Sequence, residues 1–168
     1  VAHFLTSPLV PSEWRSLPVV DVGAHDGSDW TIPAALLGHP VYTFEPTPAT
    51  FRRLLDALHA PSVHRGRPRF AVLDFHNTSS LHDHVSRSVG SRRASGTVAA
   101  INIAASDRSG TAVLTTAIDG NAQSGTSNSL NGAGAQKKAH GSVQVQIERL
   151  SHVLRAEAAP GLFLLKLD

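Results

Sequence analysis

A glycine-rich turn and an acid that follows it are the residues of this chain best suited to chemistry. Gly23, Ala24 and Gly27 come directly after the apolar run Val19–Val22, and Glu45 lies 22 positions after Gly23. Such small residues leave the backbone open to a ligand. A carboxylate at this distance can accept hydrogen bonds from both hydroxyls of a ribose. These residue types at this spacing therefore indicate a nucleoside-binding site.

A strand, a helix and a second strand are needed to position the turn and the acid. The run Val19–Val22 is β-branched without polar alternation, which is typical of a strand buried on both faces of a parallel sheet. A short helix is predicted over Trp30–Leu37, and a second buried strand over Val41–Phe44 ends at Glu45. Because ligands bind outside the carboxyl ends of parallel strands, the turn and Glu45 should lie at one edge of the sheet.

The spacing of the glycines distinguishes between two classes of nucleoside cofactor. The dinucleotide fingerprint has glycines at relative positions one, three and six. These positions hold Gly23, His25 and Ser28, so two of the three do not match. The chain has instead D-x-G-x-x-x-G, formed by Asp21, Gly23 and Gly27, which is a spacing used for S-adenosylmethionine. The pattern thus favours S-adenosylmethionine over a nicotinamide cofactor.

Five segments of the chain, taken in order, resemble the FkbM-type S-adenosylmethionine-dependent methyltransferases. They are VVDVGAHDG, VYTFEPTPATFRRLL, NIAASDRSGTAVL, VQVQIERLSHVL and FLLKLD, and together they span most of the sequence. The resemblance implies a Rossmann-like class I methyltransferase fold, which is α/β with a doubly wound, mostly parallel sheet. It implies that the methionine end is held by Asp21, Gly23 and Gly27, the ribose by Glu45, and the adenine near Ala104 and Ala105, and we count Ala24 among the cofactor-binding residues.

The chain departs from the family pattern in three places. His25 and Asp26 stand where the family usually has asparagine and an apolar residue, and about 30 extra residues precede NIAAS. The closing motif, K-x-D-x-E-G in the family, stops here at Asp168. Because the sequence also begins without methionine, we expect a segment of a longer protein, with a sheet that is incomplete at its C-terminus.

Two residues are candidates for the chemical step that the resemblance implies. In a methyl transfer, an acceptor oxygen or nitrogen attacks the sulfonium methyl in line, so catalysis depends on alignment and on removing the acceptor's proton. A buried strand predicted over Leu162–Leu167 would bring Asp168 to the same edge as Gly23 and Glu45. Asp168 is the leading candidate for this role and His25 the weaker one. We expect O-methylation of a small-molecule, sugar or lipid acceptor.

The rest of the chain is expected to complete a single domain over residues 1–168. Predicted elements are a helix over Thr47–Ala60, a strand or buried turn over Arg69–Phe75, a short helix over Leu81–Val89, a strand over Thr97–Ala105 that forms a hairpin with Thr111–Ala117, a strand through Val143, Val145 and Ile147, and a short helix that contains Leu150, Val153 and Leu154 and is terminated by Pro160 and Gly161. A loop insertion at 61–96 and a Gly/Ser/Asn-rich loop at 119–142 interrupt them.

Composition limits the class of protein and its partners. Hydrophobic residues make up 41% and charged residues 17%, as in globular proteins, and the absence of cysteine excludes disulfides and thiolate metal sites. His82 and His84 would converge on a metal only from a strand, so no metal site is expected. Eight arginines between Arg52 and Arg93 lack interleaved aromatics, so no nucleic-acid partner is expected. No apolar run approaches 18 residues and no signal peptide is visible. We favour the cytoplasm and leave the oligomeric state open.

Other functions and roles stay open at this point. A non-catalytic binding module with a methyltransferase-like fold is one alternative, because four core strands of the seven in the family would leave the last strand as an exposed apolar edge. A nicotinamide-dependent oxidoreductase is a second, disfavoured by the glycine spacing. Gly23 and Gly27 could also be turn glycines only, and Glu45 could cap the helix after Pro48, alone or together with a ligand role.

Overall fold

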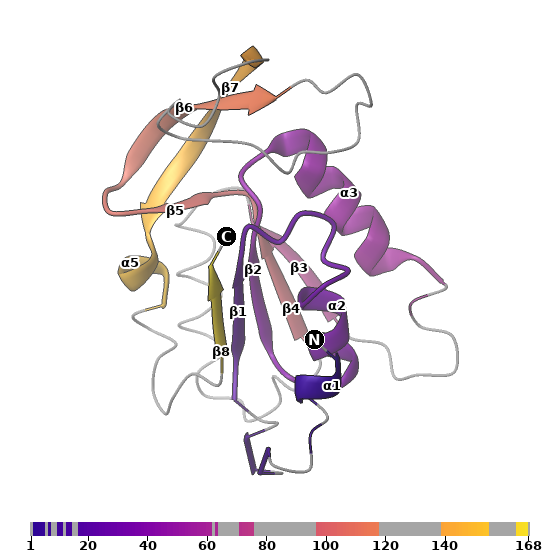
Figure 1. The fold of residues 1–168 in the computed structure, drawn as a ribbon. Helices are drawn as coiled ribbons and strands as arrows, with labels where there is room; N and C mark the ends of the chain where they lie inside the picture. The colour runs from indigo at the N-terminus through magenta and orange to yellow at the C-terminus, as the bar shows by residue number, and fades with distance from the viewer. Residues whose placement is uncertain are drawn as a thin grey trace.

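The chain folds into an α/β structure with two sheets (Figure 1). The computed structural model describes residues 2–5, 7, 10–11, 13–14, 17–61, 63, 71–75, 97–117, 139–154 and 164–167. One sheet is parallel and five-stranded, and the other is mixed and three-stranded. In Figure 1 the small sheet lies toward the carboxyl ends of the parallel strands. The architecture confirms the predicted α/β class and is compatible with a Rossmann-like fold.

The large sheet has the strand order β3-β4-β2-β1-β8, and every neighbouring pair is parallel. Its strands are β1 (Val19–Val22), β2 (Val41–Phe44), β3 (Ala71–Phe75), β4 (Thr97–Ile101) and β8 (Leu164–Leu167). The first two have the predicted bounds, and β3 shows that the segment left open as strand or turn is a strand. Val22 pairs with Phe44 on one side and with Leu167 on the other. The strand order therefore reverses at β1, beside Gly23, as predicted.

Strand β8 lies at an edge of the described sheet. Leu165 and Leu167 are 41% and 62% exposed, whereas Leu164 packs against the core. The prediction of a buried strand is therefore wrong for one face of β8, because no helix or strand among the described residues covers these side chains. The exposed apolar edge that the sequence suggested is present.

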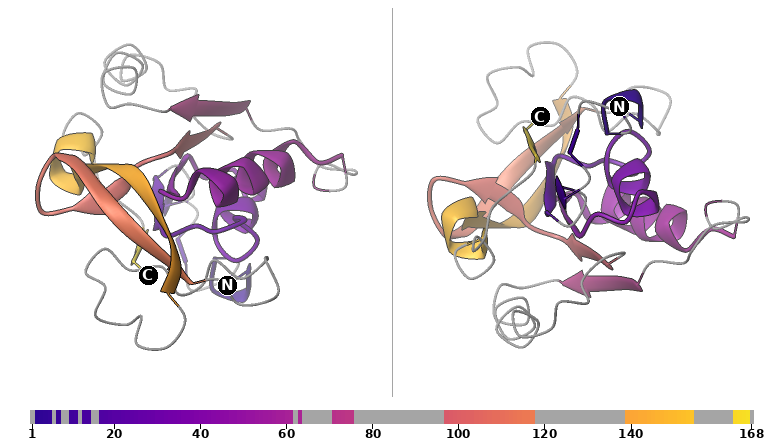
Figure 2. Two further views of the ribbon diagram at one scale, coloured as in Figure 1. Left: turned by 90° about the horizontal axis from the view of Figure 1, so that it is seen from above. Right: turned by 90° about the horizontal axis from the view of Figure 1, so that it is seen from below.

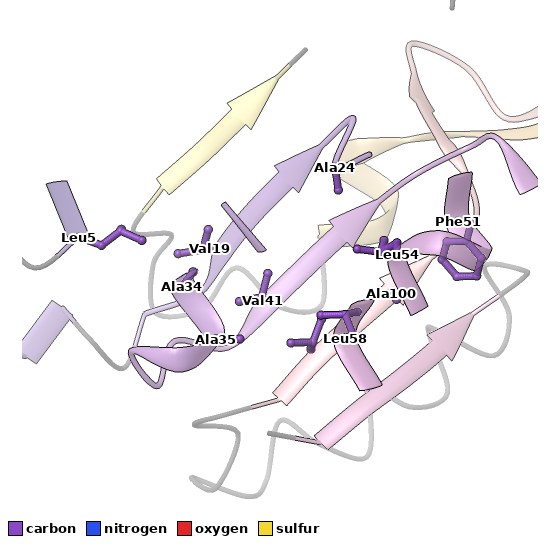
Figure 3. Close-up of a cluster of buried hydrophobic side chains, with 11 residues drawn as sticks. Leu5, Val19, Ala24, Ala34, Ala35, Val41, Phe51, Leu54, Leu58 and Ala100 are labelled. Atoms are coloured by element: carbon purple, nitrogen blue, oxygen red, sulfur yellow. The ribbon is translucent and has the colours of Figure 1, made fainter. Parts of the chain in front are cut away.

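Helices cover both faces of the large sheet. α2 (Thr31–Leu36) and α3 (Pro48–His59) pack on one face, where Figure 3 shows Ala34 beside Val19 of β1, and Leu54 and Leu58 near side chains of β2 and β4. Each of these fully buried leucines contributes about 1.5–3 kcal/mol. α1 (Ala2–Leu5) joins the same cluster through Leu5, and α5 (Leu150–Leu154) packs on the other face through Val153. The predicted helical spacing in α3 is confirmed, with Pro48 in its first turn.

The small sheet corrects two predictions. It contains β5 (Ala104–Ser106), β6 (Gly110–Ala117) and β7 (Ala139–Arg149) in the order β5-β7-β6. The strand predicted over Thr97–Ala105 is divided between the two sheets, because Asn102 turns its side chain onto Glu45 and Pro46. The predicted hairpin is also wrong, because β7 lies between β5 and β6 and is antiparallel to β6.

The small sheet has an apolar core of its own, formed by side chains of β5, β6 and β7. Its buried members are Ala104, Leu114, Val145 and Ile147. Strand β7 also begins at Ala139, so the last four residues of the loop predicted at 119–142 are strand. Figure 2 shows this sheet on the opposite side of β1 and β2 from α3.

Several predicted features fall outside the described residues. They are the helix over Leu81–Val89, the histidines His82 and His84, most of the 61–96 insertion, and residues 119–138 of the glycine-rich loop. Within the described ranges, no helix is both long enough and apolar enough to cross a bilayer.

Candidate functional site

The turn after β1 has an unusual backbone. Gly23, His25 and Gly27 have φ angles of 76°, 55° and 75°, all in the left-handed region. The turn is tied to the end of β2, since the N–H groups of Gly23 and Ala24 both donate to the Phe44 carbonyl at 3.0 Å. Glycine accepts this conformation readily, whereas His25 adopts it at a cost. The local sequence thus forms a tight turn at the carboxyl end of β1.

Gly27 is required by packing. A Cβ atom there would lie 2.6 Å from Leu54 Cδ1 and 3.3 Å from Thr31 Cβ, so helix α3 occupies the space beside this glycine. The interpretation of Gly27 as a turn glycine is therefore sufficient to explain it. Its predicted place in the methionine pocket stays a prediction.

Glu45 joins the turn to the loop after β2. Its carboxylate is buried and accepts the N–H of His25 at Oε2, 3.1 Å, and the N–H of Thr47 at Oε1, 2.9 Å. Burial raises the pKa of Glu45, and the hydrogen bonds from Thr47 and His25 only partly offset this effect. Because an ionised carboxylate has about four acceptor positions, these two bonds leave acceptor capacity for hydroxyl groups. Thr47 precedes α3, so an anchoring role at that helix and a ligand role are compatible.

Asp21 lies below the turn in a polar network that is shielded from solvent. It is 1% exposed, and its Oδ2 is 2.7 Å from Thr31 Oγ1, which is in turn 2.8 Å from Thr43 Oγ1. Because a hydroxyl has one hydrogen, Thr31 donates to the carboxylate and accepts from Thr43. The described contacts of Asp21 are therefore with protein groups, and it supports the turn from below.

Lys166 connects the end of β8 to this network. Its Nζ lies 3.1 Å from Asp21 Oδ1 and donates to the carbonyls of Gly23 at 2.9 Å and Val22 at 3.4 Å. Asp21 Oδ1 has no hydrogen-bond partner among the described residues, so its contact with Lys166 is an ion pair. The sequence interpretation missed Lys166, although a parallel register between β8 and β1 would have placed it directly opposite Asp21.

His25 and Asp26 form the exposed side of the turn. His25 Nδ1 is 3.7 Å from Asp26 Oδ1, and the His25 side chain is 34% exposed. Partial burial acts to raise the pKa of Asp26, but hydrogen bonds from Ser28 and the neighbouring His25 outweigh it and lower the pKa. His25 Nε2 is covered and has no hydrogen-bond partner among the described residues. The His25 backbone thus supports Glu45, while its ring borders the turn.

A pocket lies beside the residues that follow Glu45, between the start of α3 and the small sheet. It has a volume of about 250 Å³, and no charged residue is among its lining residues, which are Pro46, Pro48, Asn102, Thr111, Gln144, Val145 and Gln146. Asn102 Nδ2 donates to the carbonyls of Glu45 at 2.8 Å and Pro46 at 3.1 Å, which fixes the wall nearest the acid. Proline rings and uncharged amides suit a flat heteroaromatic ring with polar edges.

The two alanines predicted at the adenine edge lie elsewhere than this pocket. Ala104 is buried in the core of the small sheet, and Ala105 pairs with Glu148 of β7. A second residue that the sequence interpretation missed, after Lys166, is Asn102, the first residue after β4. Asn102 is a polar residue inside the apolar run predicted as the strand Thr97–Ala105, and this interruption was a signal that the prediction did not use.

The remaining candidate, Asp168, lies outside the described residues. Leu167, the last residue of β8, pairs with Val22, so this strand runs toward the turn. Over the described part of the chain, no group of three or more histidine, aspartate or glutamate side chains could hold a metal ion. Comparisons of the chain with protein-family models, with curated proteins and with solved structures found no match.

Proposed function

We propose that this chain is an S-adenosylmethionine-binding methyltransferase domain of class I, with Glu45 as the ribose ligand. The contact between the Glu45 carboxylate and the His25 N–H, at 3.1 Å, carries the proposal. It joins the glycine-rich turn and the acid-tipped strand at the point where the strand order reverses, which is where open α/β sheets bind nucleosides.

The order of the strands gives the ligand a direction. With the ribose on Glu45, the nucleobase would extend toward Pro46 and Asn102, and the amino-acid end toward Gly23 and the end of β8. The pocket beside Asn102 supports this assignment because its lining lacks charge and its volume is sufficient for a purine ring. We therefore assign the nucleobase subsite to the Asn102 side. Ala104 and Ala105 follow Asn102 closely in the sequence but are not among the lining residues of this pocket.

The chain's own residues would then bind the cofactor, orient it and take the acceptor's proton. When bound, S-adenosylmethionine supplies an electrophilic methyl group, whose carbon–sulfur bond breaks as the acceptor oxygen bonds to carbon. Glu45 would hold the ribose, the turn would fix the other end, and a base would take the acceptor's proton. Asp168 is the leading candidate for this base, with His25 as the alternative. A small molecule, a sugar or a lipid stays the expected acceptor.

Calorimetric titration with S-adenosylmethionine and S-adenosylhomocysteine, with NADH as control, tests the proposal. Glu45→Gln keeps the size of the side chain and removes its charge, so affinity should fall about ten- to a hundredfold, the equivalent of about 1.5–3 kcal/mol. Asp56→Asn, which removes an exposed carboxylate from α3, is the matched control. Equal affinity in wild type and Glu45→Gln would refute the ribose assignment, and binding of NADH alone would favour an oxidoreductase.

A non-catalytic interaction module is the second candidate function. The exposed Leu165 and Leu167 on the edge strand β8 favour it, because an open apolar edge promotes association. Binding of the nucleoside without methyl transfer to any class of acceptor would support this alternative.

A further inference from the structure

Lys166 carries its charge into the interior of the sheet edge, although β8 is an exposed strand. Its side chain is 15% exposed, while its neighbours in the strand, Leu165 and Leu167, face outward. Three oxygens surround its ammonium group, those of Asp21 Oδ1, the Gly23 carbonyl and the Val22 carbonyl. These contacts hold the Lys166 side chain against the end of β1 and the start of the turn, which indicates a structural role for it.

Of the contacts of Lys166, the hydrogen bond to the Gly23 carbonyl bears most directly on the path of the turn. Glycine reaches left- and right-handed conformations with similar ease, so the sequence of the turn alone does not fix its path. The Lys166 bond at 2.9 Å holds the carbonyl of this residue. That carbonyl belongs to the same peptide as the Ala24 N–H, which donates to Phe44 at 3.0 Å. One residue further, the His25 N–H reaches Glu45.

The ion pair with Asp21 provides a second reason for the lysine. A buried carboxylate is costly without a nearby positive charge or hydrogen-bond donors. Thr31 supplies one donor to Asp21 Oδ2, and Lys166 supplies the charge at Oδ1. A test of Lys166 must therefore separate neutralisation of Asp21 from positioning of the turn.

We propose that Lys166 is a positioning residue of the nucleoside site, whose ammonium group fixes the Gly23 carbonyl and so holds the His25 N–H against Glu45. Lys166 does not contact the ligand in this proposal. The ligand-binding part rests on the proposed function, whereas the effect on the turn does not.

The double variant Asp21→Asn/Lys166→Met separates the two tasks, because it removes both charges together and leaves no buried charge unpaired. We expect it to fold, to exchange the amide hydrogens of Ala24 and His25 faster than wild type, and to bind S-adenosylhomocysteine at least about tenfold more weakly. Exchange and affinity equal to wild type would overturn the proposal, since Lys166 would then serve only to neutralise Asp21.

The single variant Lys166→Ala allows chemical rescue. Added ethylamine should occupy the space of the lost ammonium, slow the exchange of Ala24 and His25 and restore affinity in part. Arg52→Ala, which removes an exposed positive charge from α3, should respond to ethylamine in neither measurement. Lack of rescue in a folded Lys166→Ala protein would count against a site for an ammonium group. If wild type binds no nucleoside, the proposed function fails, and the exchange measurements still decide the role of Lys166.

Discussion

Gly27 has no room for a side chain, so Gly27→Ala is a sharp test of its packing. An alanine Cβ would lie 2.6 Å from Leu54 Cδ1, far inside a normal contact, at a φ of 75°. The left-handed backbone costs a non-glycine residue about 1–2 kcal/mol. Forcing Leu54 from its place in the core adds about 1–3 kcal/mol. We therefore expect a loss of about 2–5 kcal/mol in the free energy of unfolding.

Gly38→Ala is a matched control for the backbone contribution. Gly38 also has a left-handed φ, 91°, but an added Cβ would have no heavy atom within 4 Å outside its own chain neighbours. Gly38→Ala should therefore lower the free energy of unfolding only by the backbone contribution, about 1–2 kcal/mol. Urea unfolding followed by circular dichroism measures both variants against wild type.

The double variant Gly27→Ala/Leu54→Ala completes a thermodynamic cycle. Leu54→Ala alone should cost about 2–5 kcal/mol, because it leaves a cavity in the core. In the double variant the new methyl group enters that cavity, so the combined loss should be smaller than the sum of the single losses by about 1–3 kcal/mol. If Gly27→Ala is no more destabilising than Gly38→Ala, or if the two losses simply add, the packing explanation is wrong.

Two further predictions concern the pocket and the small sheet. Asn102→Ala removes the donor to the Glu45 and Pro46 carbonyls and should lower the free energy of unfolding by about 1–3 kcal/mol. Gln144→Ala, which changes an exposed side chain of the same pocket, should leave stability nearly unchanged in the same urea experiment. For Glu148, partial burial acts to raise its pKa, but bonds from Ser109, the Arg149 N–H and His152 outweigh it and lower the pKa below 4.5. The ionised form therefore stabilises the fold above pH 4.5 and this contribution is lost as the pH falls through the lowered value, so wild type should lose more stability on acidification than Glu148→Gln. Parallel acid dependence of the two proteins would contradict this.

Much of the large sheet could be predicted because its signals are local. The runs Val19–Val22 and Val41–Phe44 are rich in β-branched and aromatic residues and are followed closely by glycine or proline, and both strands have the predicted bounds. The spacing of Phe51, Leu54 and Leu58 likewise predicted the buried face of α3. Each of these elements is determined by residues that lie within one strand or one helical turn of each other.

The small sheet could not be predicted in the same way because its pairing is remote in sequence. Strand β6 is close to β5 along the chain, which favours a hairpin. The strand that lies between them is nevertheless β7, which begins at Ala139, 22 positions after Ala117 at the end of β6. The apolar residues Leu114, Val145 and Ile147 form a core only in that arrangement. Alternation showed that β7 is a strand without indicating its partner.

The candidate site shows the same division between local and remote information. Gly23 and Glu45 could be identified from their types and spacing, because one strand–helix–strand unit carries both. Asn102 and Lys166 could not, since each contacts that unit from a distant part of the chain. Both side chains donate to backbone carbonyls of the unit. Because every residue type has a backbone carbonyl, the sequence of the unit does not indicate that Asn102 or Lys166 will bind there. The sequence does show polar residues at positions where a buried strand favours apolar ones. A lysine within Leu164–Leu167 and an asparagine directly after Thr97–Ile101 are polar residues in or beside largely apolar strands, and both lie against the turn or the acid. A polar residue in or directly after a buried parallel strand is therefore the signal by which the remote half of such a site can be sought.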